Sequence, residues 1–177
     1  METTHEDNVA SRQKLAVAAR TGVFLAVLLA VQLIGLPNPV TGTIVNAIFI
    51  FVLLYSGLRH ALILAFLSPF GGIVSGHLPA PMYPILPVIV CGNFALIGLY
   101  FIFSKHSMPL RLVFPALVKG VIIGVAGYVI VQILDIVATA KWLLMPVLGF
   151  QFFTAVAGLF VGERLFQSLL RGRGDSV

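Results

Sequence analysis

The stretch IVNAIFIFVLL, residues 44–54, decides the fold, because Asn46 is its single polar residue. The stretch VIIGVAGYVI, residues 121–130, is similarly apolar on every side. A strand of a transmembrane β-barrel would instead alternate apolar and polar residues. Hydrophobic residues make up 59% of the chain and charged residues 10%, and the mean hydropathy is +1.07, far outside the range of soluble domains. We therefore predict an all-α integral membrane protein.

The 177 residues leave room for six membrane-spanning helices and little else. A helix needs about 20 apolar residues to cross roughly 30 Å of hydrocarbon. Such spans fit at residues 15–36, 42–58, 60–77, 83–103, 115–135 and 142–165. We expect one six-helix membrane domain, residues 14–170, between an N-terminal tail, residues 1–13, and a C-terminal tail, residues 171–177. The first span runs past 20 residues into Leu36-Pro37-Asn38-Pro39 with no small-x-small cleavage site there, so we expect it to be retained.

The basic residues predict the orientation, because cytoplasmic loops of membrane proteins are enriched in Lys and Arg. With the N-terminus inside, the cytoplasmic set is Arg12, Lys14, Arg20, Arg59, Lys105, Arg111, Arg164, Arg171 and Arg173. Lys119 is expected in the first turn or so of the fifth span, from which its side chain would extend to the same side. The prediction is N-in and C-in, with Asp135 and Lys141 in an outer loop.

Small residues recur every four positions along the first span, at Ala18, Gly22, Ala26 and Ala30. This spacing places them on one face of a helix, where another backbone can approach closely. Packing against a helix of the same chain and contact with a partner protein both stay open. The repeats GVIIG, residues 120–124, and GLFVG, residues 158–162, are assigned mostly to internal packing.

Uncharged polar side chains gather in the outer half of the predicted bundle. Counted from the outer helix ends at about 1.5 Å per residue, Gln132 lies roughly 5 Å deep, Gln32 and Asn46 roughly 6 Å, Tyr128 roughly 10 Å, Gln151 roughly 12 Å and Asn93 roughly 15 Å. No polar column crosses the membrane, which favours a one-sided cup over a pore. Each of these side chains could also simply bond a neighbouring helix.

The third span is expected to be irregular, because Pro69, Gly71, Gly72 and Gly76 interrupt it before His77. Interrupted membrane helices often line binding sites. The proline-rich link at residues 37–42 could form a lid over the cup or a plain turn. The predicted substrate-binding residues are Asn46, His77, Asn93, Tyr128, Gln132 and Gln151.

Catalytic and nucleotide-binding motifs do not emerge from the sequence. We expect neither enzymatic activity nor a metal site or cofactor, and the scattered cations give no nucleic-acid-binding stripe. No ionisable residue is evident at mid-membrane, where proton-coupled carriers usually keep one. A cup with few fixed charges favours a neutral or weakly charged, small, aromatic molecule.

Six short spans, Ala26-x-x-x-Ala30, the proline-rich first link and the Gly/Pro-rich third span together resemble the substrate-binding S component of energy-coupling-factor (ECF) transporters. The resemblance covers roughly residues 14–170. It implies a multi-pass protein of a prokaryotic plasma membrane that captures a vitamin or related micronutrient. By the same resemblance, Gly22, Ala26 and Ala30 would contact a transmembrane coupling subunit that is driven by two cytoplasmic ATPase subunits.

Three alternatives stay open beside this reading. The chain could be a structural or assembly subunit of a membrane complex, in which the polar residues only bond helices together. It could be a self-sufficient secondary carrier. An intramembrane enzyme is the last alternative.

Overall fold

The structure is a computed structural model that describes residues 3–134 and 138–174, with the backbone alone described for residues 3–11, 13, 14, 138–148, 173 and 174. This part of the chain is helical and contains no strand, as predicted. Its elements are α1 (Thr3–Leu33), α2 (Asn38–Ser56), α3 (Leu58–Val74), η1 (Ala80–Ile85), α4 (Leu86–Phe103), α5 (Met108–Val121), η2 (Ile122–Ala126), α6 (Gly127–Ile133) and α7 (Ala138–Gly174). Here η1 is a 3₁₀-helix and η2 is a single π-helical turn.

Five helical segments are long and apolar enough to cross a membrane. They are Leu15–Leu33, Asn38–Ser56, Ala80–Phe103, Met108–Ile133 and Gly149–Gly172. This is the pattern of a multi-pass membrane protein. The apolar α3 has 17 residues, or about 26 Å of helix, so the sixth span stays a prediction.

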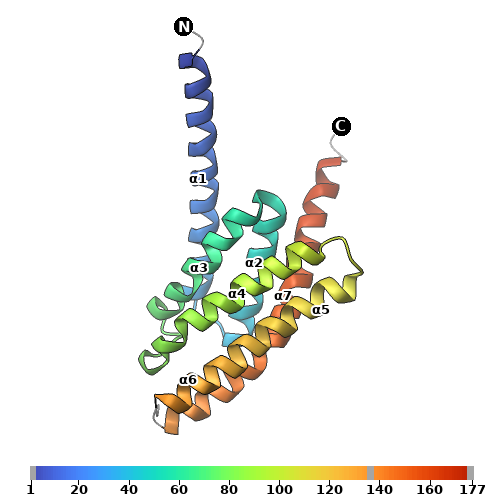
Figure 1. Ribbon diagram of the computed structural model, residues 1–177. Helices are drawn as coiled ribbons and strands as arrows, with labels where there is room; N and C mark the ends of the chain where they lie inside the picture. Colours follow the sequence, from blue (N-terminus) through green and yellow to red (C-terminus); the bar gives the residue numbers. More distant parts are fainter. Residues whose placement is uncertain (1–2, 135–137, 175–177) are drawn as a thin grey trace.

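The helices form a bundle in which α1 and α7 extend beyond the others at the same end (Figure 1). Helix α2 makes its most extensive contacts with α7, and α4 lies between α3 and α5. The core of the bundle consists of large apolar side chains that are completely or almost completely buried, among them Leu28, Phe49, Ile50, Leu64, Leu96 and Leu159.

Close packing of α2 against α7 depends on two glycines of α7. A Cβ atom added at Gly158 would meet the carbonyl oxygen of Thr43 at 2.7 Å, and one at Gly162 would meet that of Ala47 at 2.5 Å. Both contacts are with backbone of α2, which cannot rotate away as a side chain can. The GLFVG repeat therefore packs internally, as predicted, whereas only the first glycine of GVIIG is packed closely, against Phe152.

Helix α3 is not interrupted at Pro69, contrary to expectation, and it ends only at Val74. A proline inside a helix removes the N–H that would bond the carbonyl four residues earlier, which here belongs to Ala65. The side-chain amide of Asn93 on α4 donates to that carbonyl at 3.4 Å instead. The chain turns sharply only at Gly76, whose φ is +75°.

Two helices begin at least seven residues earlier than the sequence indicated. Helix α1 starts at Thr3, so helical backbone extends into the segment expected to be a tail. Helix α5 starts at Met108, although the fifth span was placed from residue 115. The second difference moves Lys119 from a helix end into the middle of the bundle.

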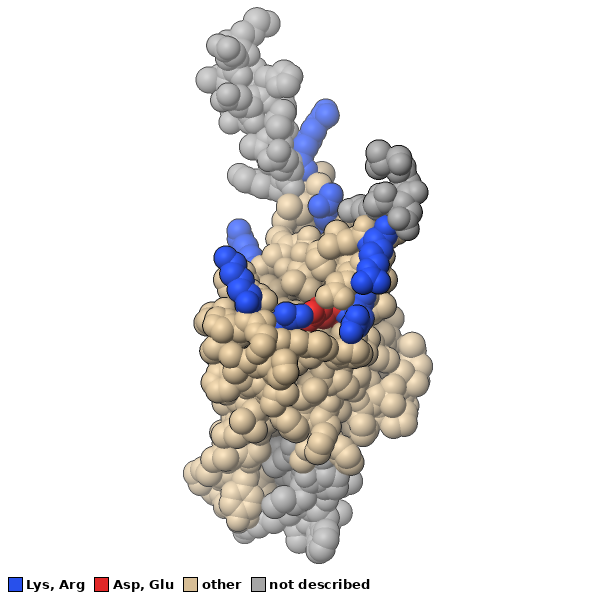
Figure 2. Space-filling model, turned by 90° about the vertical axis from the view of Figure 1, so that its right-hand side faces the viewer, with Lys and Arg blue, Asp and Glu red and all other residues tan. Residues whose placement is uncertain are grey.

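Exposed basic side chains lie toward the end of the bundle at which α1 begins and α7 ends. In Figure 2 they form a band near this end, and the described surface beyond the band shows none on that face. The exposed basic residues are Arg12, Arg20, Arg59, Lys105, Arg164 and Arg171. The asymmetry has the form that the positive-inside rule requires, and the N-in, C-in orientation stays a prediction. Asp135 and the side chain of Lys141, expected in an outer loop, lie outside the described residues.

Candidate functional site

A polar cavity of about 160 Å³ lies in the half of the bundle away from the basic band. Helices α1, α2, α3, α4, α5 and α7 all contribute side chains to it. Its polar lining is formed by Gln32, Asn38, Thr41, Asn46, Ser68, His77, Asn93, Lys119 and Gln151. Its remaining walls are Gly42, Val45, Pro69, Gly72, Leu78 and Ile89.

The structure brings four of the six predicted substrate-binding residues to this cavity, namely Asn46, His77, Asn93 and Gln151. Asn46 and Asn93 are almost completely buried. The four residues come from α2, the α3–η1 link, α4 and α7, so residues far apart in the sequence meet in one place. Asn46, Asn93 and Gln151 had been selected by their counted depth, and His77 by its place after the third span.

Tyr128 and Gln132 do not line this cavity. The side chain of Tyr128 is 47% exposed, and Gln132 is exposed as well. The π-helical turn η2 lies between Lys119, which faces the cavity, and Tyr128, so the direction of the Tyr128 side chain does not follow from α-helical spacing. Depth alone cannot distinguish the two sides of a helix, and the position of a residue around the axis has to be counted too.

Lys119 is the charged residue of the cavity that the sequence did not place there. It is 3% exposed, and its Nζ donates to Oδ1 of Asn46 at 2.7 Å. Its side chain does not extend to the basic end of the bundle, as was expected, because α5 begins at Met108 and Lys119 lies about 17 Å along the helix from that end. The start of α5 could have been predicted from Met108-Pro109, because proline is common in the first turn of a helix. Arg111, shortly after it, is typical of a cytoplasmic helix end.

The remaining polar groups of the cavity are only partly satisfied. Gln32 on α1 donates through Nε2 to the hydroxyl of Ser68 on α3 at 3.0 Å. Its Oε1 is buried and has no hydrogen-bond partner among the described residues. A buried acceptor without a partner is uncommon and calls for a water or a ligand group. This acceptor lies against Gly71 of α3, so it is enclosed between α1 and α3 at the edge of the cavity.

His77 closes the outer side of this cavity. Its Nε2 donates to the carbonyl oxygen of Leu36 at 3.0 Å, and its Nδ1 lies 2.8 Å from the hydroxyl of Ser75. The first bond joins the α1–α2 link to the α3–η1 link. A shallow surface hollow of about 510 Å³, lined by both links, lies on the outer side of His77. His77 lines both spaces, so it separates the surface hollow from the inner cavity.

The opposite end of the bundle holds a separate ionic cluster around Glu163 of α7. Its carboxylate pairs with Arg111 of α5 and accepts hydrogen bonds from the hydroxyl of Tyr100 and from Nε2 of Gln167, each at 3.1 Å. The cluster joins α4, α5 and α7 and has its charges matched, so it requires no ligand.

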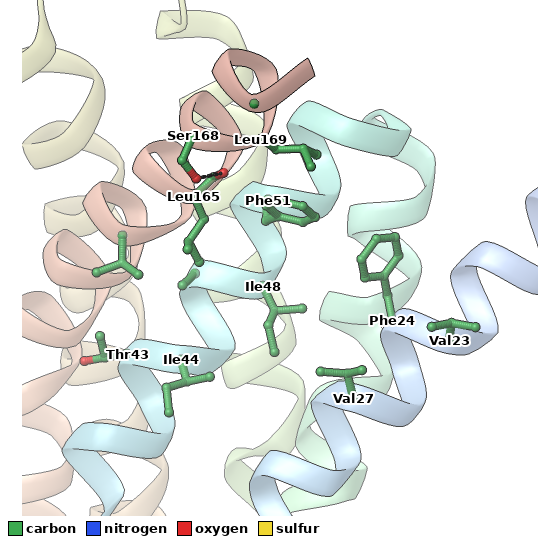
Figure 3. A pocket seen from close by; sticks show the side chains of 13 residues that line it. Val23, Phe24, Val27, Thr43, Ile44, Ile48, Phe51, Leu165, Ser168 and Leu169 are labelled. Atoms are coloured by element: carbon green, nitrogen blue, oxygen red, sulfur yellow. Dashed lines mark hydrogen bonds between the residues drawn. The ribbon is translucent and has the colours of Figure 1, made fainter. Parts of the chain in front are cut away.

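A larger hollow of about 790 Å³ opens between α1, α2 and α7 (Figure 3). Its walls are apolar, with Val27, Ile48 and Phe51 pointing into it. Of its few polar side chains, Ser168 already donates to the carbonyl of Leu165 at 2.8 Å, as the dashed line shows. It offers the kind of surface that lipid chains or apolar helices cover, and it has little chemistry to recognise a polar solute.

The small residues of α1 lie on a free face of that helix. Gly22, Ala26 and Ala30 are exposed, and a Cβ atom added at Gly22 would meet nothing within 4 Å. Leu28, which is fully buried in the core, is two residues from both alanines, or about 200° around the helix. Ala26 and Ala30 thus point away from the described core, whereas Gly22 lines a hollow that Arg59 and His60 of α3 also line.

Comparison with protein-family models, with curated proteins and with solved structures finds no match to this chain. The site therefore rests on geometry alone. Among the described residues, no group of three or more His, Cys, Asp or Glu side chains is placed to hold a metal ion.

Proposed function

We propose that the chain is the substrate-capture (S) subunit of an ECF-type importer, and that the polar cavity holds its substrate. The observation that carries the proposal is the cavity itself, to which six helices contribute and whose lining is rich in polar side chains. Binding sites of this kind are concave, with apolar walls and a few well-placed polar groups. The substrate would be a vitamin or a related small micronutrient.

The free small-residue face of α1 supports the second half of the proposal. Membrane helices associate through small residues that let backbones approach closely. Because Gly22, Ala26 and Ala30 are exposed, they are available to a transmembrane coupling subunit. Two cytoplasmic ATPase subunits would supply energy to the coupling subunit. The complex would be located in a plasma membrane of prokaryotic type.

Tryptophan at Ala26 and Ala30 tests this assignment. Because both side chains are exposed, A26W and A30W should leave the thermal unfolding temperature and ligand binding unchanged, while uptake by cells that contain the partner subunits should fail. The matched control is V125W, at an exposed position in η2. Cells that contain V125W should take up the substrate normally. If A26W and A30W lose binding and uptake equally, the face serves the chain's own packing and the proposal is wrong.

One observation favours a second candidate, a self-sufficient secondary carrier. Lys119 places an ionisable group in the middle of the bundle, where none was expected from the sequence. Proton-coupled carriers usually keep such a group at mid-membrane. Liposomes that contain only the purified chain distinguish the two candidates. The importer proposal predicts that a proton or sodium gradient drives no accumulation of the ligand bound by the purified chain. Accumulation would establish the carrier.

A further inference from the structure

Among the residues that the structure describes, no carboxylate at the polar cavity matches the charge of Lys119. No Asp or Glu is among the residues that line it. Glu163 is already paired with Arg111, which precedes Lys119 by eight residues, or about 12 Å along α5. The described partner of the Lys119 ammonium is the amide oxygen of Asn46, at 2.7 Å.

A buried ammonium in this position has two ways to avoid an unmatched charge. It can give up its proton, or it can be matched by an anion. An ammonium has three N–H donors, and the bond to Asn46 uses one of them. Two donors of Lys119 thus remain beside an open cavity, enough for the two oxygens of a carboxylate.

We propose that the polar cavity binds a small organic monocarboxylate, whose carboxylate accepts hydrogen bonds from Lys119. One cation matches one negative charge, which favours a monoanion over a doubly charged phosphate. Val45, Leu78 and Ile89 on the walls suit an apolar body on the ligand. The volume of about 160 Å³ is below the roughly 300–1,000 Å³ of pockets for drug-sized ligands, so the ligand is small.

This inference names the substrate class of the proposed capture function and therefore rests on it. It also replaces the neutral or weakly charged ligand that the sequence indicated. That earlier prediction followed from placing Lys119 at the helix end, outside the cup. With Lys119 in the cavity, the site contains a group that can carry a positive charge.

Calorimetric titration of the purified full-length chain in nanodiscs tests the carboxylate directly. The probes are acetate, butyrate and benzoate, each paired with its amide of nearly the same shape, together with inorganic phosphate and sulfate. At least one carboxylate should bind about tenfold or more tightly than its amide, because a charge-assisted hydrogen bond is lost in the amide. Equal affinity for acid and amide, or binding of phosphate or sulfate alone, would overturn the assignment.

Variants at Lys119 then test whether this residue causes the preference for a carboxylate over its amide. K119M should bring the affinity for the carboxylate down to that for the amide, and K119R should keep part of the preference. K105M is the control, since Lys105 is exposed in the α4–α5 link, and it should bind as the wild type does. If K119M does not fold, the comparison of acid with amide in the wild type still decides the question.

The remaining outcomes separate this inference from the proposed function. A neutral metabolite that binds the wild type and K119M equally would overturn the carboxylate and leave substrate capture intact. A folded wild-type chain that binds none of the probes and nothing from a broad metabolite panel would overturn both.

Discussion

Two buried charges, Glu163 and Lys119, differ in what surrounds them. The carboxylate of Glu163 pairs with Arg111 and accepts hydrogen bonds from Tyr100 and Gln167. Lys119 has the amide of Asn46 and an open cavity. Removing one partner of a buried ion pair destabilises the fold, because the other charge is left unmatched. An unmatched charge beside a cavity is instead a candidate for binding a ligand. The first charge is therefore assigned to stability and the second to function.

Glu163 should consequently be a stability residue. E163Q leaves Arg111 without its counter-ion, and because this pair is partly exposed to solvent, the expected loss is about 1–3 kcal/mol of unfolding free energy. Chemical denaturation in detergent measures it, with R164Q as the control at the neighbouring exposed position. Unchanged stability in E163Q, or an equal loss in R164Q, would contradict the assignment.

Single residues also show how far the sequence could predict the site. Asn46, Asn93 and Gln151 were found because polar side chains in hydrocarbon are costly and hence face the interior. Lys119 was missed because an error of seven residues in the start of one helix moved it by about two turns. Tyr128 was included because depth says nothing about the direction around the helix axis.

At the scale of elements, the α2–α7 pair determines the shape of the bundle. Gly158 and Gly162 let the two backbones approach closely, and Asn46 lies on α2 beside Gly158. The pair therefore holds one wall of the cavity in position. A change that separates these helices should disturb the fold and the cavity together.

G158A should destabilise the protein, because the added methyl group would clash with the backbone of α2. Overpacking of this kind typically costs about 1–3 kcal/mol, measured as a lower denaturant midpoint in detergent. G149A on the same helix is the control, since a Cβ atom there meets nothing within 4 Å, and it should be neutral or slightly stabilising. A G158A variant as stable as G149A would show that α2 and α7 are not closely packed.

Element boundaries were harder to predict than the elements themselves. Long apolar runs predicted the helices, because hydrophobic length is a local property of the sequence. The continuity of α3 through Pro69 could not be predicted, because it depends on Asn93 from another helix, which bonds the carbonyl that the proline leaves free. Contacts between distant segments decide such details, and a single sequence does not contain them explicitly.

At the scale of the whole molecule, the two ends of the bundle differ in chemistry. One end carries the basic band and the Glu163 cluster, and the other carries the polar cavity below His77. The α1 face with Ala26 and Ala30 runs along the side and is unused by the chain itself. A one-sided cavity and a free lateral face are what a capture subunit that depends on a partner requires.

Quantitative mass spectrometry of the small molecules that co-purify with the chain tests this account most directly. The comparison includes Q151L, which removes a polar group from the cavity wall, and F153L, an exposed position on the same helix. The account predicts one compound in a fixed molar ratio to the wild type and F153L, and clearly less of it with Q151L. A wild-type chain that carries no compound and binds none from a broad metabolite panel would contradict it.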